Sequence, residues 1–116
     1  MGVKLAIVGS RSFADYQRLK SIAAEFDPSA IVSGGARGTD LLAQRYAYEA
    51  GLQLIVFLPE WQRFGRAAGP MRNRKIIQAA DRVLAFWDGS SAGTQSAIKI
   101  AQKAGKPIHV VRFVAE

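Results

Sequence analysis

Three glycines and an arginine stand close together in the sequence IVSGGARGTD at residues 31–40. An apolar run enters this stretch and a helical pattern leaves it, so the backbone has to turn sharply at the glycines. The start of the following helix adds unpaired N–H donors and the positive end of the helix dipole. Arg37 adds a forked positive charge that suits phosphate. The stretch therefore predicts an anion-binding loop, although a tight turn from a strand into a helix uses the same glycines without any ligand.

Two further loops carry the same kinds of residue. Residues 9–12, with the sequence GSRS, follow the first apolar run and combine a glycine, hydroxyl donors and an arginine. They depart from the GxGxxG fingerprint, so nicotinamide or flavin binding has little support. Residues 90–94, with the sequence SSAGT, open a later helix and again offer N–H donors to an anion. Ordinary turns contain the same residue types, so each loop alone is a weak signal.

Basic residues and a strand-end pair extend the predicted site. Arg72, Arg74 and Lys75 lie near a helix start, where the dipole disfavours positive charge, and this placement favours an anionic partner over a merely solvated basic face. Trp87 could stack on a base, and Asp88 could accept hydrogen bonds from ribose or a base edge. Their simpler interpretations are a half-buried strand aromatic and a turn aspartate.

These stretches together define one expected ligand site. Main-chain N–H groups and serine hydroxyls are expected to hold phosphate, and arginines are expected to supply charge. The expected ligand- and phosphate-binding residues are Gly9, Ser10, Arg11, Ser33, Gly34, Gly35, Arg37, Gly38, Thr39, Asp40, Arg72, Asn73, Arg74, Trp87, Asp88, Ser91, Gly93 and Thr94. No catalytic residue is assigned, no metal site is expected, and a nucleotide-type ligand is the only cofactor-like molecule that we expect.

Strand and helix patterns alternate along the whole chain. Strands are expected at residues 3–8, 30–32, 54–58, 82–87 and 108–111. Helices are expected at residues 16–26, 39–50, 71–80 and 94–105, with Asp15, Thr39 or Asp40, and Thr94 as caps and with Pro70 in the first turn of the third. Residues 59–70 have no clear periodicity and are predicted to form a long loop.

This alternation predicts an α/β fold, a Rossmann-like three-layer αβα sandwich around a five-stranded parallel sheet. We favour the strand order 3-2-1-4-5, which places the switch point between the first and fourth strands. Ligands of open α/β sheets bind at the carboxyl ends of the strands beside such a point. The loops after strands one, two and four are therefore expected to converge there.

Composition restricts the classes of protein to consider. The chain has 116 residues, expected to form one domain over residues 1–116, and 49% of them are hydrophobic. Without cysteine and with one histidine, the chain offers no disulfide, thiolate site or multi-histidine metal site. The net charge of +7 favours anionic partners, from mononucleotides to nucleic acid. No signal-peptide layout or membrane-length apolar run is visible, so a cytoplasmic protein with no membrane partner is expected.

The set of motifs resembles the SLOG superfamily of Rossmann-like domains that bind nucleotides and nucleotide-derived ligands. The stretches that carry the resemblance are GSRSF at 9–13, VSGGARGTD at 32–40, GPMRNRKI at 69–76 and WDGSSAGT at 87–94. The chain looks most similar to the small, single-domain YspA-like branch. The resemblance implies a nucleotide or nucleotide-derived ligand.

Two better-known groups of the superfamily suggest alternatives. The DNA-processing protein A family, which binds single-stranded DNA, has stretches similar to residues 32–40 and 70–76. The Lonely guy family of phosphoribohydrolases has stretches similar to residues 71–75 and, in part, 90–97. Its motif glutamate falls on Ala97 here, and N-glycosidic hydrolysis needs a carboxylate, which leaves Asp40 or Asp88 as the substitutes to consider.

The sequence thus predicts a nucleotide-binding protein that acts as a sensor or accessory domain rather than as an enzyme. The first alternative is a single-stranded DNA or RNA binder that uses its basic surface with Trp61, Phe64 or Trp87 as stacking platforms. The second is a nucleoside-monophosphate phosphoribohydrolase. Partners would be a nucleotide, single-stranded nucleic acid, or a second copy of the chain in a homodimer. Helix residues such as Leu41, Leu42 and Tyr46 could contribute to that dimer.

Overall fold

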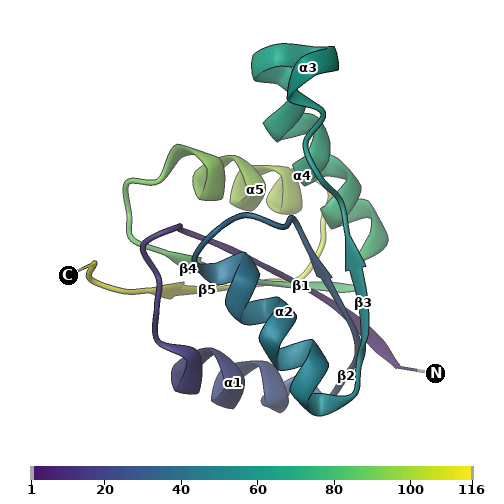
Figure 1. The fold of residues 1–116 in the computed structure, drawn as a ribbon, viewed down its shortest axis with the longest axis vertical. Coiled ribbons are helices and arrows are strands. Elements are labelled where there is room, and N and C mark those ends of the chain that lie inside the picture. Colours follow the sequence, from purple (N-terminus) through teal and green to yellow (C-terminus); the bar gives the residue numbers. More distant parts are fainter. Residues whose placement is uncertain (1, 116) are drawn as a thin grey trace.

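Five strands alternate with helices along the chain in the computed structural model, which describes residues 2–115 (Figure 1). The strands are β1 (Val3–Gly9), β2 (Pro28–Ser33), β3 (Gln53–Val56), β4 (Arg82–Trp87) and β5 (Ile108–Arg112). The helices are α1 (Tyr16–Glu25), α2 (Thr39–Ala50), α3 (Trp61–Phe64), α4 (Ala68–Ala79) and α5 (Ala92–Lys103), and a 3₁₀ turn, η1 (Gly65–Ala67), joins α3 to α4.

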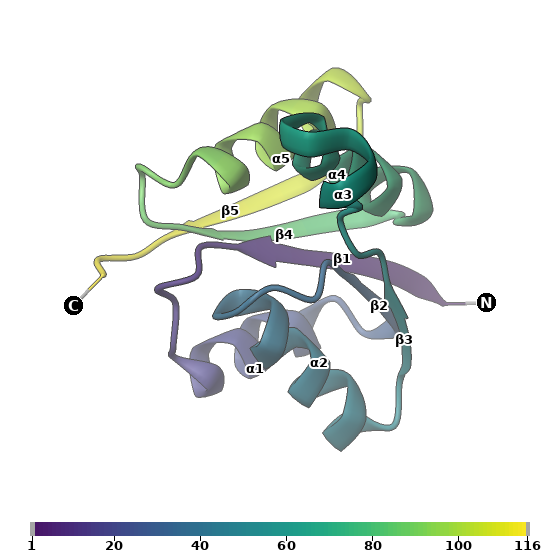
Figure 2. The ribbon, with the colours of Figure 1, turned by 45° about the horizontal axis from the view of Figure 1, so that its top comes forward.

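The five strands form one parallel sheet in the order β3-β2-β1-β4-β5. This is the predicted order, and the predicted Rossmann-like α/β fold is confirmed. Helices α1 and α2 cover one face of the sheet, and α4 and α5 cover the other (Figure 2). From β1 the chain proceeds to β2 and β3 on one side of the sheet, and then crosses to β4 and β5 on the other side. Strands β1 and β4 are neighbours at this switch point, so the loops that follow them lie side by side at the carboxyl edge of the sheet.

Alternating side chains of the central strands fill two cores. On β1, Leu5 and Ile7 face the core under α1 and α2, whereas Ala6 and Val8 face the core under α4 and α5. Because both faces of the strand are buried, its sequence is apolar without a polar alternation. The core beneath α4 and α5 contains several alanines, which let these helices lie close to the sheet.

Two predicted strand boundaries, the start of β2 and the end of β3, are wrong. Strand β2 begins at Pro28, not at Ala30, because a proline without an N–H group fits the first position of a strand. Strand β3 ends at Val56, and only one further bond, from the Phe57 N–H group to the Ser33 carbonyl, follows it (3.0 Å). Leu58, which was predicted to lie in this strand, is 66% exposed.

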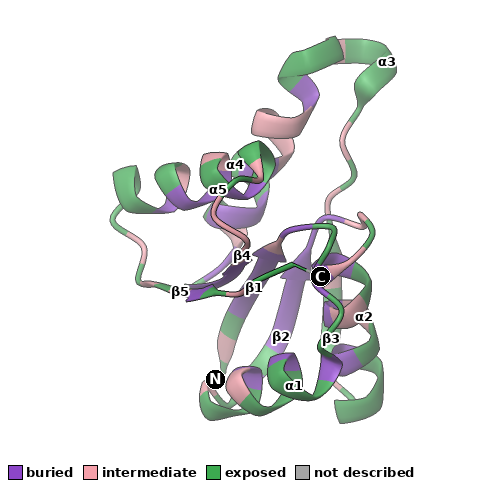
Figure 3. Ribbon diagram, turned by 90° about the vertical axis from the view of Figure 1, so that its left-hand side faces the viewer, coloured by how far each residue is buried: buried purple, intermediate pink, exposed green. Residues whose placement is uncertain are grey.

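The predicted loop at residues 59–70 is wrong, because most of it is helical. Helix α3 and the turn η1 fill residues 61–67, and α4 begins at Ala68, three residues before its predicted start. None of residues 61–67 is buried, so no apolar period marks them in the sequence (Figure 3). Pro70 lies in the first turn of α4, where its missing N–H group has no helical partner to lose.

The caps of α2 and α5 also differ from the prediction. Gly38 and Ser91 occupy the N-cap positions, and neither makes a side-chain capping bond. Thr39 and Thr94 instead lie inside the first turns of these helices. By contrast, Asp15 caps α1 as predicted, through a bond that it accepts from the Arg18 N–H group.

The Thr39 hydroxyl links α2 to the loop after β1. Thr39 is fully buried, and its Oγ1 donates to the Ser10 carbonyl at 2.9 Å. We expect Thr39→Val to lower the free energy of unfolding by about 1 kcal/mol, because it removes this bond and keeps the shape of the side chain. Urea unfolding measures the loss. An unchanged free energy of unfolding would mean that this bond contributes nothing net.

Two expectations about surfaces have structural counterparts. Of the residues suggested for a homodimer, Tyr46 is buried in the core and Leu42 packs against that core, so only Leu41, which is 52% exposed, is available for contact. No helix within residues 2–115 is long and apolar enough to cross a bilayer.

Candidate functional site

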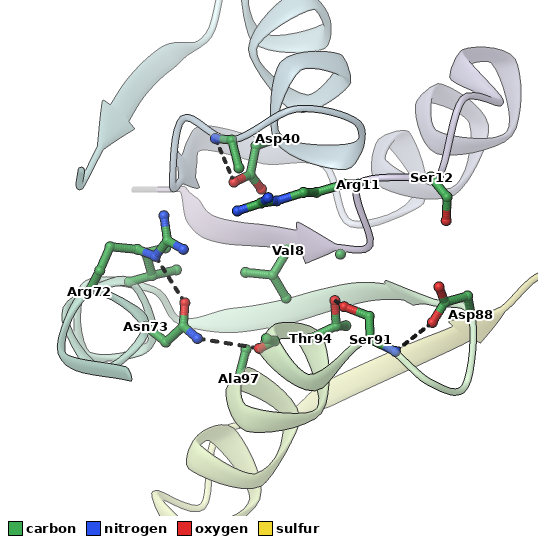
Figure 4. Close-up of a pocket in the computed structure, with 14 residues that line it drawn as sticks. Val8, Arg11, Ser12, Asp40, Arg72, Asn73, Asp88, Ser91, Thr94 and Ala97 are labelled. Atoms are coloured by element: carbon green, nitrogen blue, oxygen red, sulfur yellow. Dashed lines mark hydrogen bonds between the residues drawn. The ribbon is translucent and has the colours of Figure 1, made fainter. Parts of the chain in front are cut away.

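A cavity of about 430 Å³ opens at the carboxyl edge of the sheet, where the loops after β1, β2 and β4 meet (Figure 4). The predicted convergence of these three loops at the switch point is therefore present. Helix α4 closes the remaining side through Arg72, Asn73 and Ile76. The cavity is lined by Val8, Gly9, Arg11, Ser12, Ala36, Asp40, Arg72, Asn73, Ile76, Asp88, Ser91, Gly93, Thr94 and Ala97.

The N-terminus of α5 presents main-chain donors to this cavity. The N–H groups of the first helical turn, which includes Gly93 and Thr94, have no partners within the helix. Both residues line the cavity, and a side chain added at Gly93 would meet open space. The Ser91 and Thr94 hydroxyls lie 3.2 Å apart and add polar groups to the same end of the helix. This end of α5 therefore has the features of an anion-binding site.

Asp88 holds the loop that leads into α5. Its Oδ1 accepts bonds from the N–H groups of Ser90 (2.9 Å) and Ser91 (2.8 Å). These two bonds hold the pKa of the Asp88 carboxyl below its usual range, so the group is charged at neutral pH. The indole of Trp87 donates to the Ser91 carbonyl at 3.1 Å and fixes the same turn from the other side.

Arg72 and Asn73 connect the loop after β2 to the start of α5. The Arg72 Nη1 donates to the Gly34 carbonyl at 2.8 Å, and its Nε donates to the Asn73 Oδ1 at 3.0 Å. The Asn73 Nδ2 in turn donates to the Gly93 carbonyl at 3.4 Å. A Cβ atom on residue 34 would lie 2.5 Å from Arg72 Nη1, so a side chain there would displace the guanidinium from its present position. Because Arg72 uses only part of its set of five donors, the rest remain for a ligand.

Asp40 is a buried carboxyl beside two arginines. It is 7% exposed, and its Oδ2 accepts the Ala36 N–H group at 3.0 Å. Burial raises the pKa of Asp40, and the Ala36 N–H group and the nearby Arg72 and Arg11 charges oppose that rise. Arg11 extends into the cavity next to Asp40 (Figure 4). Two guanidinium groups against one carboxyl leave this side of the cavity positive.

The raised pKa of Asp40 predicts a pH-dependent stability. The folded chain binds this proton more tightly than the unfolded chain, so the contribution of Asp40 to the free energy of unfolding falls as the pH rises from about 4 through the folded-state pKa. We expect the difference in that free energy between the natural chain and Asp40→Asn to fall over this range and then to level off. Urea unfolding at a series of pH values measures it. A constant difference, or one that grows with pH, would contradict the assignment.

The structure brings half of the predicted site residues to the cavity wall. These are Gly9, Arg11, Asp40, Arg72, Asn73, Asp88, Ser91, Gly93 and Thr94. They come from all four stretches that the sequence singled out. Arg72 and Asn73 stand out among them, because they also bridge the loops after β2 and β4 through the Gly34 and Gly93 carbonyls.

The other predicted residues support the cavity wall or lie away from it. Gly34 receives the Arg72 bond, and Gly38 packs against the Arg11 backbone. The Ser10 hydroxyl is buried and accepts the Asp88 N–H group at 3.2 Å. The remaining predicted residues that do not line the cavity are Ser33, Gly35, Arg37, Thr39, Arg74 and Trp87.

Three of these residues lie outside the cavity in clearly different environments. Arg37 is exposed to solvent, and Arg74 lies in a hollow on the outer side of α4. The Ser33 hydroxyl is fully buried and has no hydrogen-bond partner among residues 2–115. The loop after β2 therefore contributes Asp40 and Ala36 to the cavity, and its own arginine stays outside.

Sequence reasoning did not select five of the lining residues. They are Val8, Ser12, Ala36, Ile76 and Ala97. Apolar residues at core-like spacing look the same whether they face a cavity or a packed interior, so only the three-dimensional arrangement separates them. Ser12 lies in the GSRS loop that the sequence did single out, next to the chosen residues. Position 97, where the Lonely guy resemblance places a glutamate, presents a methyl group to the cavity.

In the described part of the chain, no three His, Asp or Glu side chains gather in a way that could hold a metal ion. The polar groups of the cavity are instead arginines, main-chain N–H groups, hydroxyls, the Asn73 amide and two carboxyls. This set suits an anion that also carries hydrogen-bonding groups.

Residues 3–64, more than half of the chain, match the family model of the YspA, cpYpsA-related SLOG family. The chain belongs to this family. The Gene 61 protein of Mycobacterium phage D29 is 36% identical over 116 aligned positions, which cover 90% of this SLOG chain and 93% of the phage protein. The resemblance to the SLOG superfamily that the motifs predicted is confirmed.

Two solved structures share the fold of this SLOG chain. DNA processing protein A from Streptococcus pneumoniae matches with a TM-score of 0.80 and 20% identity, over 97% of this chain and 51% of that protein. DNA processing protein A from Helicobacter pylori, whose structure concerns a single-stranded DNA binding mode, matches with a TM-score of 0.76 and 26% identity, over 94% of this chain and 65% of that protein. This chain thus spans about half to two thirds of these relatives.

Proposed function

We propose that this chain binds a nucleotide or a nucleotide-derived small molecule in the cavity, with a phosphate group at the N-terminus of α5. One observation carries the proposal: the N–H groups of the first turn of α5 face Arg11 and Arg72 across a single cavity. A helix N-terminus favours an anion, and forked guanidinium groups pair well with phosphate oxygens. The cavity volume of about 430 Å³ lies within the range of small-molecule sites.

The carboxyl groups of the cavity suit the rest of a nucleotide. Asp88 is charged and lies at the cavity wall, where it can accept hydrogen bonds from ribose hydroxyls or from a base edge. Asp40 keeps its position between two arginines through its bond from Ala36. Because position 97 is alanine, α5 offers no carboxylate to activate water. We therefore favour a sensor or accessory domain that binds its ligand over a hydrolase.

Calorimetric titration with nucleoside 5′-monophosphates and with the matching nucleosides tests the proposal. Nucleosides lack the phosphate and therefore the charge-assisted hydrogen bonds that it would accept. The loss of one such bond costs roughly 1.5–3 kcal/mol of binding free energy, so nucleosides are expected to bind more than tenfold more weakly. Nucleosides that bind as tightly as nucleotides would contradict the assigned phosphate position. Free base released during the titration would instead support the hydrolase alternative.

A second candidate function is the binding of single-stranded nucleic acid. It is favoured by the net charge of +7 and by the similarity to the Helicobacter pylori protein, whose structure concerns single-stranded DNA binding. Affinity for oligonucleotides that rises with strand length and falls steeply with salt would support it. Affinity that is equal for mononucleotides and oligonucleotides would favour the small-molecule function.

A further inference from the structure

The excess positive charge of the chain lies in its second half. Residues 1–60 contain six Lys or Arg and six Asp or Glu, whereas residues 61–116 contain ten and three. Helices α1 and α2 together carry three basic and three acidic residues, but α4 and α5 carry five basic residues and no acidic one. Since these two pairs cover opposite faces of the sheet, one helical layer is neutral and the other is positive (Figure 2).

A groove runs between α4 and α5 on the outer side of this positive layer. It consists of two hollows of about 390 and 300 Å³ that share Arg74, Lys99 and Ile100 as lining residues. The first hollow extends to Lys103 and the second to Pro70. The two helices run in the same direction, so the groove follows them for about two turns, or roughly 12 Å. We call it the α4–α5 groove.

The cations along the α4–α5 groove are available to a partner. Arg74, Lys99 and Lys103 are exposed, and within residues 2–115 none of them forms an ion pair with a carboxylate. The other polar groups of the groove are amides and hydroxyls, such as Gln78, Gln95 and Ser96. Lysine, arginine, glutamine and serine are the side chains that contact nucleic-acid phosphates and sugars.

We propose that the α4–α5 groove binds the phosphodiester backbone of a single-stranded nucleic acid. The proposal rests on the second candidate function, because it names the surface that such a strand would use. One end of the groove lies at Ala92, next to Gly93 in the cavity wall, so a strand with one nucleotide in the cavity can continue into the groove.

Other occupants fit the α4–α5 groove less well. It lacks the exposed aromatic side chains that anchor protein partners, since the described residues that line it include none. A second copy of the chain would bring the three basic residues of the groove, Arg74, Lys99 and Lys103, against the same three residues.

The double variant Lys99→Gln/Lys103→Gln tests the proposal, because glutamine keeps the length and helix propensity of lysine while it removes the charge. Its matched control is Lys4→Gln/Lys20→Gln, which removes two exposed lysines that belong to β1 and α1 and line neither hollow of the groove. Binding of labelled single strands of about 12 nucleotides, as DNA and as RNA, is measured by fluorescence anisotropy between about 50 and 200 mM salt. Binding of adenosine 5′-monophosphate is measured in parallel by calorimetry.

We expect the Lys99/Lys103 variant to bind the single strands roughly tenfold or more weakly and to lower the salt slope by about 1.4, which corresponds to two lost phosphate contacts. The control variant is expected to keep both values, and both variants are expected to bind the mononucleotide normally. DNA and RNA that bind alike would identify the shared backbone as the ligand, and a preference would identify which of them binds.

Several outcomes would overturn the groove proposal. Equal losses in both double variants would mean that only net charge matters. Displacement of the strand by poly-glutamate as readily as by oligonucleotide would point to an acidic protein partner, and tighter binding of a duplex would exclude the single-strand assignment. Mononucleotide binding without any strand binding would overturn this inference and leave the cavity proposal intact, whereas strand binding at the groove without mononucleotide binding would do the reverse.

Discussion

Gly93→Asp is expected to fold at least as stably as the natural chain and to lose most of its affinity for nucleoside monophosphates. The added side chain has open space around it and lies in the first turn of α5, where a carboxylate gains about 0.3–1 kcal/mol from the helix dipole. The same carboxylate would stand where we propose that phosphate binds. Repulsion between the added carboxylate and a phosphate a few ångströms away amounts to about 2–4 kcal/mol, which corresponds to a loss of roughly 30-fold to 700-fold in affinity.

Gly93→Asn is the matched control, because its side chain has the same shape without the charge. Thermal or urea unfolding measures stability, and calorimetry measures affinity for both variants. We expect the asparagine variant to retain much more of the affinity than the aspartate variant. Natural affinity in Gly93→Asp would mean that phosphate does not bind at the start of α5.

Gly38→Ala is expected to cost about 3 kcal/mol of stability or more and to weaken ligand binding as well. Gly38 has φ +70° and ψ −123°, a backbone conformation that residues other than glycine rarely adopt. An added Cβ would also lie 2.3 Å from the Arg11 carbonyl oxygen, so the backbone after β1 would have to move. Because Arg11 lines the cavity, the displacement would reach the ligand site. Urea unfolding and calorimetry measure the two effects.

Gly51→Ala is the control that separates the two causes of the loss in Gly38→Ala, the strained backbone conformation and the close approach of the added Cβ to Arg11. Gly51 also has a positive φ, of +68°, but an added Cβ there meets nothing within 4 Å. The alanine variant is then expected to lose only the cost of the left-handed conformation, about 1–2 kcal/mol of the free energy of unfolding. If the two alanine variants lose equal stability, the contact between Gly38 and Arg11 does not constrain the fold.

The sheet could be predicted from the sequence because its strands are buried on both faces. Residues Leu5 to Val8 and Val83 to Phe86 are continuous apolar runs, and each is followed by a turn signal and a helical period. Right-handed crossovers then leave few possible strand orders, and the ligand loops necessarily meet at the switch point. This reasoning depends only on burial and chain connectivity, both of which a sequence records.

Side-chain direction within the loops could not be predicted in the same way. Arg37 looks like the obvious anion ligand among the glycines, yet the Asp40 carboxylate takes the Ala36 N–H group and Arg37 is exposed to solvent. The guanidinium that contacts this loop belongs instead to Arg72 of α4. It lies 38 residues after Gly34, whose carbonyl accepts its hydrogen bond. The helical segment at residues 61–67 was missed for a related reason, since it extends away from the core and carries no apolar period (Figure 3).

Amide chemical shifts of the ¹⁵N-labelled protein during titration with adenosine and guanosine 5′-monophosphates test the central claim most directly. We expect the amides of Ala92, Gly93 and Thr94 to shift together with the Arg72 side-chain Nε–H, all with one dissociation constant. Unphosphorylated nucleosides are expected to move these signals far less at the same concentrations. Saturable binding that leaves the first turn of α5 unchanged and moves other amides would contradict the proposed phosphate site.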